Sequence, residues 1–217
     1  STKPEHANIP TIPFEDWYNL DLLSLGNVKY ILSQKPIQDA RLELRPPTIT
    51  AADREAWWTR SVKEKVKGYI RGENPGAPMY IYENPAAVDR FFLAHEIRPF
   101  EEEEALFAAL GQAELSDLTN QVMVLKQDVV DWVMAQTNIA AEAFELVEHD
   151  PERAVLRVQN ESAKVLVFTN LYYPWWECTL NREPVKIVRA YGAYMAVRIP
   201  PGDNDIQFEY RPPYKVF

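Results

Sequence analysis

The chain has 217 residues, 47% of them hydrophobic and 25% charged, and a formal net charge of −9 at pH 7. This composition is that of a globular protein with a packed core, and it excludes a disordered chain. The negative charge repels a phosphate backbone and the lysines and arginines are scattered, so we expect no nucleic-acid partner. The one cysteine, Cys178, excludes an intrachain disulfide and a cysteine-based metal cluster.

The sequence contains no apolar run of the roughly 18 residues that a spanning helix needs, and its first residues lack the apolar stretch of a signal peptide. We therefore expect a water-soluble domain. Residues 214–217 follow directly on a strand-like run, which suggests a piece of a longer protein.

The first part of the chain mixes helix and strand patterns. Thr50 and Asp53 have the spacing of a capping box, which predicts a helix from there to about residue 69. Gly26-Asn27 predicts a left-handed stop for the preceding helix, and Pro46-Pro47 predicts the end of a strand. The other predicted elements are a helix over 16–25, strands over 28–32, 40–44, 79–82, 91–97 and 121–125, a helix over 105–110, and a short helix or extended connection over 128–135.

The pattern changes after about residue 144, because strand-like runs then recur every 10 to 12 residues with turn residues between them. This is the pattern of an antiparallel β-sandwich, Ig-like or jelly-roll-like. We predict an α+β fold, with a mixed α/β portion over residues 1–140 and a β-sandwich over 141–217. The predicted strands are 144–148, 154–159, 164–169, 176–180, 185–188, 194–199 and 205–210.

The most unusual local feature is an aromatic cluster around Pro174, made of Tyr172, Tyr173, Trp175 and Trp176. Exposed tyrosine and tryptophan rings at a sandwich edge can stack on the apolar faces of sugar rings, so these four residues are candidates for a glycan site. The alternative is structural: alternate rings face the core while Pro174 fixes a bend.

Candidate catalytic groups are weaker. The pairs Glu96 with Glu101 and Asp128 with Asp131 could supply the two carboxylates of a glycosidase, although 32 acidic residues offer many chance pairs. His6, His95 and His149 are too widely spaced to suggest a zinc site, and phosphate-loop, dinucleotide and serine-nucleophile motifs are missing. Cys178 lies within a predicted strand, which favours a buried, inert thiol. We therefore expect no cofactor and no metal site.

Several segments together resemble the C-terminal region of YfhO-type bacterial membrane proteins, which are multi-spanning and similar to GT-C glycosyltransferases. The resemblance rests on residues 22–32 (LLSLGNVKYIL), 82–87 (YENPAA), 172–176 (YYPWW), 184–187 (PVKI), 200–202 (PPG) and 208–212 (FEYRP). Such proteins usually have a glycine after Tyr-Tyr-Pro and an Asp-Gly hairpin shortly afterwards. Here Trp175 and Asn181-Arg182 occupy those places.

The resemblance implies a non-catalytic domain on the extracytoplasmic face of the bacterial cell membrane. Its partners would be the transmembrane portion of its parent protein and a cell-envelope glycan, and any glycosyl transfer would take place in the membrane-embedded part. Two other hypotheses remain open: a free-standing carbohydrate-active hydrolase with a carboxylate pair, and a purely structural domain whose aromatic rings are all buried.

Overall fold

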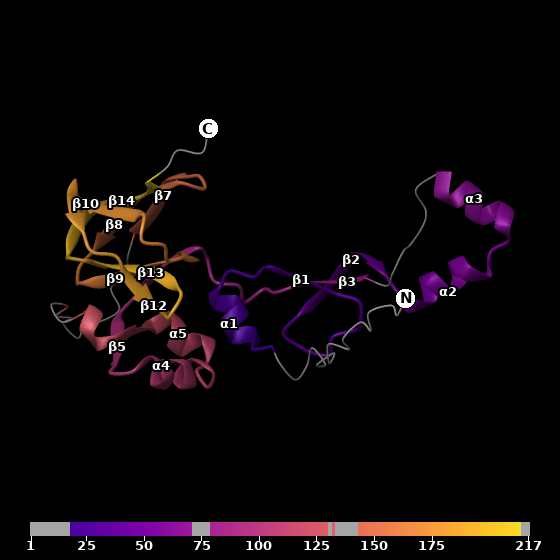
Figure 1. Cartoon of the computed structure of the whole chain (residues 1–217), viewed down its shortest axis with the longest axis horizontal. Helices are drawn as coiled ribbons and strands as arrows, with labels where there is room; N and C mark the ends of the chain where they lie inside the picture. Colours follow the sequence, from indigo (N-terminus) through magenta and orange to yellow (C-terminus); the bar gives the residue numbers. More distant parts are fainter. Residues whose placement is uncertain (1–17, 71–78, 130–131, 133–142, 214–217) are drawn as a thin grey trace, which may run out of the picture. The chain divides into compact units, whose positions relative to one another are not determined.

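The computed structural model describes residues 18–70, 79–129, 132 and 143–213, and Figure 1 shows their helices and strands. The chain divides into two compact units, one formed by residues 1–23 and 28–87 and the other by residues 24–27 and 88–217. Each unit has its own buried core, so we describe them one at a time.

The first unit contains a three-stranded antiparallel sheet in the order β1-β3-β2. Its elements are α1 (Leu20–Leu25), β1 (Tyr30–Ser33), β2 (Glu43–Ile49) and β3 (Met79–Glu83). A small core joins the sheet to α1 and the β1–β2 connection, and consists of Leu20, Ile31, Ile37, Leu42 and Tyr82. Asn27 has a φ of 61°, which confirms the predicted left-handed stop after α1.

Asn84 links two of the segments on which the sequence resemblance rests, 22–32 and 82–87. Its side chain is 2% exposed and donates to the carbonyl of Val28 at 3.0 Å, while its backbone N–H donates to the carbonyl of Lys29 at 2.8 Å. Its side-chain oxygen accepts from the N–H of Ala86 at 3.2 Å. One buried amide therefore ties the turn after β3 to the residues just before β1.

Two local predictions in this unit are wrong for identifiable reasons. Pro46-Pro47 does not end its strand, because β2 is an edge strand, where a missing N–H costs little, and the ladder merely becomes irregular between Arg45 and Ile49. The helix predicted from Thr50 to residue 69 is two helices, α2 (Ala51–Thr59) and α3 (Val62–Ile70).

The break between α2 and α3 has a local cause in the sequence, a second capping box that was not predicted. The predicted capping box of Thr50 and Asp53 is present at the start of α2. Arg60 then takes an extended backbone with φ −63° and ψ 148°. The Ser61 hydroxyl and N–H donate to the Glu64 carboxylate at 2.8 and 3.0 Å, and the Glu64 N–H donates to the Ser61 oxygen at 3.4 Å, which makes a second capping box. A new helix therefore begins at Val62.

The second unit is built on two sheets whose facing sides share one core. The five-stranded sheet has the order β11-β10-β14-β8-β7. Its strands are β7 (Ala143–His149), β8 (Arg153–Asn160), β10 (Trp176–Leu180), β11 (Glu183–Val185) and β14 (Gly202–Tyr210), all paired antiparallel.

The six-stranded sheet has the order β4-β9-β13-β12-β6-β5. Its strands are β4 (Phe91–Ala94), β5 (Glu96–Phe100), β6 (Gln121–Leu125), β9 (Lys164–Leu171), β12 (Val188–Ala190) and β13 (Tyr194–Ile199). The strand predicted over 91–97 is thus two strands that lie at opposite edges of the sheet, with only His95 between them. A flat sheet would separate these edges by roughly 24 Å, whereas two residues span at most about 7 Å, so the sheet must curl.

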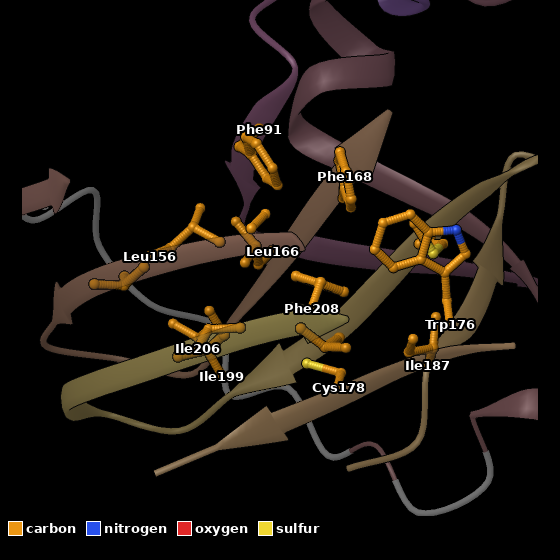
Figure 2. Close-up of a cluster of buried hydrophobic side chains, with 14 residues drawn as sticks. Phe91, Leu156, Leu166, Phe168, Trp176, Cys178, Ile187, Ile199, Ile206 and Phe208 are labelled. Carbon is orange, nitrogen blue, oxygen red and sulfur yellow. The ribbon is translucent and has the colours of Figure 1, made fainter. Parts of the chain in front are cut away.

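Side chains from both sheets meet in a single hydrophobic core (Figure 2). Phe168 of β9 lies at its centre, with its ring centroid 4.3 Å from that of Phe91 and 5.3 Å from that of Phe208. Cys178 is 3% exposed in this core, as predicted, and burial raises the pKa of its thiol to about 12. The predicted α+β fold with a β-sandwich is confirmed.

Two helices contact the β4, β5 and β6 strands of the six-stranded sheet. They are α4 (Glu103–Leu110), which begins two residues before the helix predicted over 105–110, and α5 (Leu115–Asn120). Together they connect β5 to β6, the one parallel pair among the described strands. A helical crossover is the usual way to join parallel neighbours, so this βααβ unit is self-consistent. A short 3₁₀ turn, Lys126–Asp128, follows β6, and most of the segment predicted over 128–135 lies outside the described residues.

The remaining strand predictions are confirmed apart from two. The strand predicted over 40–44 shares only Glu43 and Leu44 with β2. The run predicted over 185–188 divides into β11 and β12, which belong to different sheets. Residues 91–125 supply three strands to the same sheet as β9, β12 and β13, so this sheet draws on residues from both sides of position 140. The division of the chain into a mixed α/β portion over 1–140 and a β-sandwich over 141–217 stays a prediction.

Candidate functional site

The four predicted glycan-binding residues lie in the connection between β9 and β10 and at the start of β10. Residues 172–175, which we call the aromatic loop, follow β9, and Trp176 is the first residue of β10. Three backbone hydrogen bonds hold the loop. They run from the N–H of Tyr172 to the carbonyl of Ala193 at 2.8 Å, from Trp176 to Tyr173 at 3.1 Å, and from Arg211 to Trp175 at 2.8 Å.

Burial divides these aromatic side chains into two groups. Tyr172 and Tyr173 are 38% and 50% exposed, whereas Trp176 is 8% exposed and belongs to the sandwich core. The Trp176 ring packs edge-on to Phe168 with centroids 5.6 Å apart (Figure 2). Trp176 is therefore an anchor of the loop, and the accessible rings are those of the two tyrosines.

Trp175 lies between these extremes. Its side chain is half-buried, and its ring centroid lies 6.3 Å from that of Tyr210 in an edge-on arrangement. The Tyr210 ring also lies 5.4 Å from Trp176, so one tyrosine of β14 contacts both tryptophans. This packing limits the rotamers open to Trp175 and gives the loop a defined ring orientation at small entropic cost.

Charged groups lie beside the aromatic loop. Arg211, whose N–H donates to the Trp175 carbonyl, pairs through its guanidinium with Glu209 at 2.8 Å and with Glu177 at 3.2 Å. The hydrogen bond from Arg211 lowers the pKa of Glu209, which keeps that carboxylate ionised. The surface next to the rings thus offers both donors and acceptors that could receive sugar hydroxyls.

A second concave region lies on the five-stranded sheet and was not predicted. It is an open groove of about 350 Å³ across β7, β8 and β14. Arg157 lies in it with its guanidinium 3.4 Å from Asp205 and 3.8 Å from Glu145. These three residues occupy one row across the sheet, and only the strand register brings them together. The side chains are each more than 60% exposed, so the ion pairs are solvent-screened.

The predicted carboxylate pairs do not form a catalytic arrangement in the described residues. Glu96 begins β5 and Glu101 follows its last residue, so the extended strand holds them roughly 16 Å apart. The carboxyl groups of glycosidases are about 5 to 9.5 Å apart. Glu96 instead accepts a hydrogen bond from Gln121, and Glu101 pairs with Lys126. Asp128 pairs with Lys186 at 3.9 Å, and Asp131 lies outside the described residues.

The histidines are dispersed among unrelated contacts. His95 Nδ1 lies 2.5 Å from the amine of Lys164, whose side chain is buried at the start of β9. His149 packs edge-on against Phe91 at 5.6 Å, and His6 lies outside the described residues. Among the described residues no three histidine, cysteine or acidic side chains are grouped so that they could hold a metal ion.

Comparison with known proteins identifies the family. No curated protein and no solved structure matches the chain significantly. Within the described parts of the chain, no helix is both long enough and apolar enough to cross a bilayer. A family model described as bacterial membrane protein YfhO matches residues 108–217, which is half of the chain and includes β6 to β14 with the aromatic loop. The resemblance noted in the sequence is thus confirmed, and the chain belongs to the YfhO family of bacterial membrane proteins.

Proposed function

We propose that this chain is a non-catalytic extracytoplasmic domain of a YfhO-type membrane protein, and that its aromatic loop binds a cell-envelope glycan. The observation that carries the proposal is the pairing of two exposed rings, Tyr172 and Tyr173, with a buried anchor, Trp176. A loop that only filled the core would bury its rings. A loop that presents them on a fixed backbone suits stacking on a pyranose face.

The neighbouring polar groups support this choice of ligand. A sugar ring offers an apolar face for an aromatic side chain and hydroxyls for planar polar groups. Arg211 and its two carboxylate partners lie next to Trp175, and the guanidinium N–H groups outside the two ion pairs and the carboxylate oxygens provide donors and acceptors. A neutral glycan would form hydrogen bonds with Arg211, Glu177 and Glu209 and would leave their ion pairs in place.

The family membership supports the association with a membrane. A YfhO-type protein is a membrane protein, and this domain would lie outside the bilayer beside the transmembrane portion of its parent. We place any glycosyl-transfer chemistry in that portion. The domain would then position the acceptor glycan. The hydrolase alternative gains no support, because the carboxylates of Glu96 and Glu101 lie too far apart for it.

The test is a calorimetric titration of the 217-residue chain with soluble peptidoglycan fragments and with neutral hexose oligosaccharides. Tyr173→Ala should weaken binding about fivefold to tenfold, because one stacking contact contributes about 1 kcal/mol. Tyr30→Ala is the matched control, since Tyr30 has a similar exposure of 57% but lies on β1 of the other unit. Tyr30→Ala should leave the affinity unchanged.

Tryptophan signals provide an independent readout. The indole N–H resonance of half-buried Trp175 should shift on titration, whereas that of buried Trp176 should shift less. Absence of binding to every envelope glycan tested would reject the glycan role and leave the loop as a packing element. Equal losses of affinity in Tyr173→Ala and Tyr30→Ala would reject the assignment to the aromatic loop.

A further inference from the structure

The pair of helices α2 and α3 carries an exposed apolar stripe and a local excess of positive charge. Trp58, Val62 and Val66 are 59%, 79% and 53% exposed. Residues 60–67 hold four cationic side chains and one acidic one, a net charge of +3 in a chain whose total is −9. We propose that these two successive helices (Figure 1) dock on an anionic phospholipid bilayer, independently of the glycan role proposed above.

The helical geometry of α3 places basic groups on both flanks of the apolar strip. At about 100° per residue, Val62 and Val66 lie about 40° apart, with Lys65 about 60° to one side of Val62 and Lys63 about 100° to the other. Lys63 and Lys67 are exposed, as are the two valines. This arrangement is that of an interfacial amphipathic helix, whose apolar strip enters the headgroup layer while lysines contact phosphates.

The single acid in this stretch does not oppose the interaction. Glu64 lies about 200° from Val62, on the side away from the apolar strip. Its carboxylate is engaged by the Ser61 N–H at 3.0 Å and by the Ser61 hydroxyl at 2.8 Å. Glu64 interacts electrostatically with Arg60 and Lys67, and the stretch keeps its net charge of +3 with Glu64 included.

Trp58 extends the apolar strip from α3 back to α2. The Lys65 amine lies 5.2 Å from the centre of the Trp58 ring and donates to the Trp58 carbonyl at 2.7 Å. The ring is thus held next to α3 while remaining mostly exposed. Tryptophan prefers the headgroup level of a bilayer, where its apolar body and its N–H are both accommodated.

A bilayer fits this surface better than another protein does, for two reasons. The chain belongs to a membrane-protein family, so a lipid bilayer would be near this domain. The local charge of +3 complements anionic lipid headgroups, each lysine near such a surface contributing favourably. A soluble polyanion could use the same lysines, but it would have no use for exposed valines.

The test is flotation of the 217-residue chain with vesicles of phosphatidylglycerol and phosphatidylcholine, compared with vesicles of phosphatidylcholine alone. The chain should partition onto the anionic vesicles at least tenfold better, and the difference should shrink at high salt. Lys63→Glu/Lys67→Glu should reduce this partitioning more than tenfold. Lys35→Glu/Lys126→Glu makes the same change in net charge elsewhere and should leave it nearly unchanged.

A second pair of variants separates a bilayer from a soluble polyanion. Val62→Gln/Val66→Gln keeps residues that favour helix and should reduce partitioning about fivefold or more, whereas Leu32→Gln, at a site 63% exposed, should not. Circular dichroism confirms that each variant is folded. Equal partitioning onto both kinds of vesicle, equal losses in the two lysine variants, or full retention in the valine variant would each overturn the proposal.

Discussion

Arg182 holds a backbone conformation that a residue with a Cβ rarely adopts. It has a φ of 72° and follows Asn181, whose φ is 52°, so the two residues form the turn between β10 and β11. A two-residue hairpin turn of type I′ needs positive φ at both positions, and Asn-Gly or Asp-Gly satisfies this most readily. Here the Asn181 side-chain oxygen also accepts the N–H of Asp205 at 2.8 Å, which helps to hold the turn.

Replacing Arg182 by glycine should therefore stabilise the protein by about 0.5–1 kcal/mol, since the relief of the strained φ exceeds the added entropy of the unfolded chain. Urea denaturation measures the change. Glu183→Gly is the control, because Glu183 lies in β11 without a positive φ and should lose stability. A destabilised Arg182→Gly variant would mean that the arginine side chain contributes more than its backbone costs.

The turn between β12 and β13 packs against α4. Tyr191 and Gly192 both have positive φ, 52° and 71°, and are the central residues of a tight turn in which the N–H of Ala193 donates to the carbonyl of Ala190 at 3.0 Å. The buried Tyr191 hydroxyl donates to the carbonyl of Leu118 at 2.5 Å and so ties α5 to the same turn. Burial raises the pKa of Tyr191, which therefore keeps its proton and this hydrogen bond.

Gly192 also leaves room for Phe107 of α4. A Cβ on residue 192 would lie 2.5 and 2.9 Å from two atoms of the Phe107 ring. We expect Gly192→Ala to destabilise the protein by about 2 kcal/mol, partly through this clash and partly through the positive φ.

A double-mutant cycle tests the two causes separately. Phe107 is 51% exposed, so Phe107→Ala alone should cost little, and in combination it should recover about half of the loss from Gly192→Ala. Additive losses would show that the clash contributes nothing and that the backbone conformation accounts for the whole effect.

At the scale of the whole molecule, His149 makes the stability of the sandwich depend on pH. It ends β7, and its ring lies edge-on to Phe91 at 5.6 Å and to Phe168 at 6.2 Å, so it links one sheet to the other. Partial desolvation lowers the pKa of His149 although its side chain remains largely exposed; the positive charge of Arg90 adds to this effect, and Asp150 opposes it.

The sign of the pH effect follows from this lowered pKa. Below pH 6.5 the unfolded chain binds a proton at this imidazole while the folded chain does not, so acid favours unfolding. The free energy of unfolding should fall as the pH drops from about 7 through 6.5, until the folded-state pKa is reached. His149→Phe keeps an aromatic ring against Phe91 and should reduce this decline. Urea unfolding at pH 7 and pH 5 measures this decline. If the free energy of unfolding falls as much in His149→Phe as in the original protein, another group causes the pH dependence.

Some of this protein follows from the sequence alone, because the causes act within a few residues. The capping box of Thr50 and Asp53, the turn at Asn181-Arg182 and the strand run that buries Cys178 each depend on hydrogen bonds or alternation between near neighbours. The second capping box, at Ser61 and Glu64, also depends only on residues three positions apart, although it was not predicted. The family motifs belong to the same class of local information.

Other features depended on the tertiary structure. The sequence placed Tyr173 and Trp176 in one aromatic cluster, but only packing against Phe168 buries the tryptophan and leaves the tyrosine exposed. The groove around Arg157 and the position of β4 and β5 at opposite edges of one sheet arise from pairings between residues far apart in the chain. Burial and strand register are collective properties: each depends on where many distant segments lie, and no short stretch of sequence contains that information.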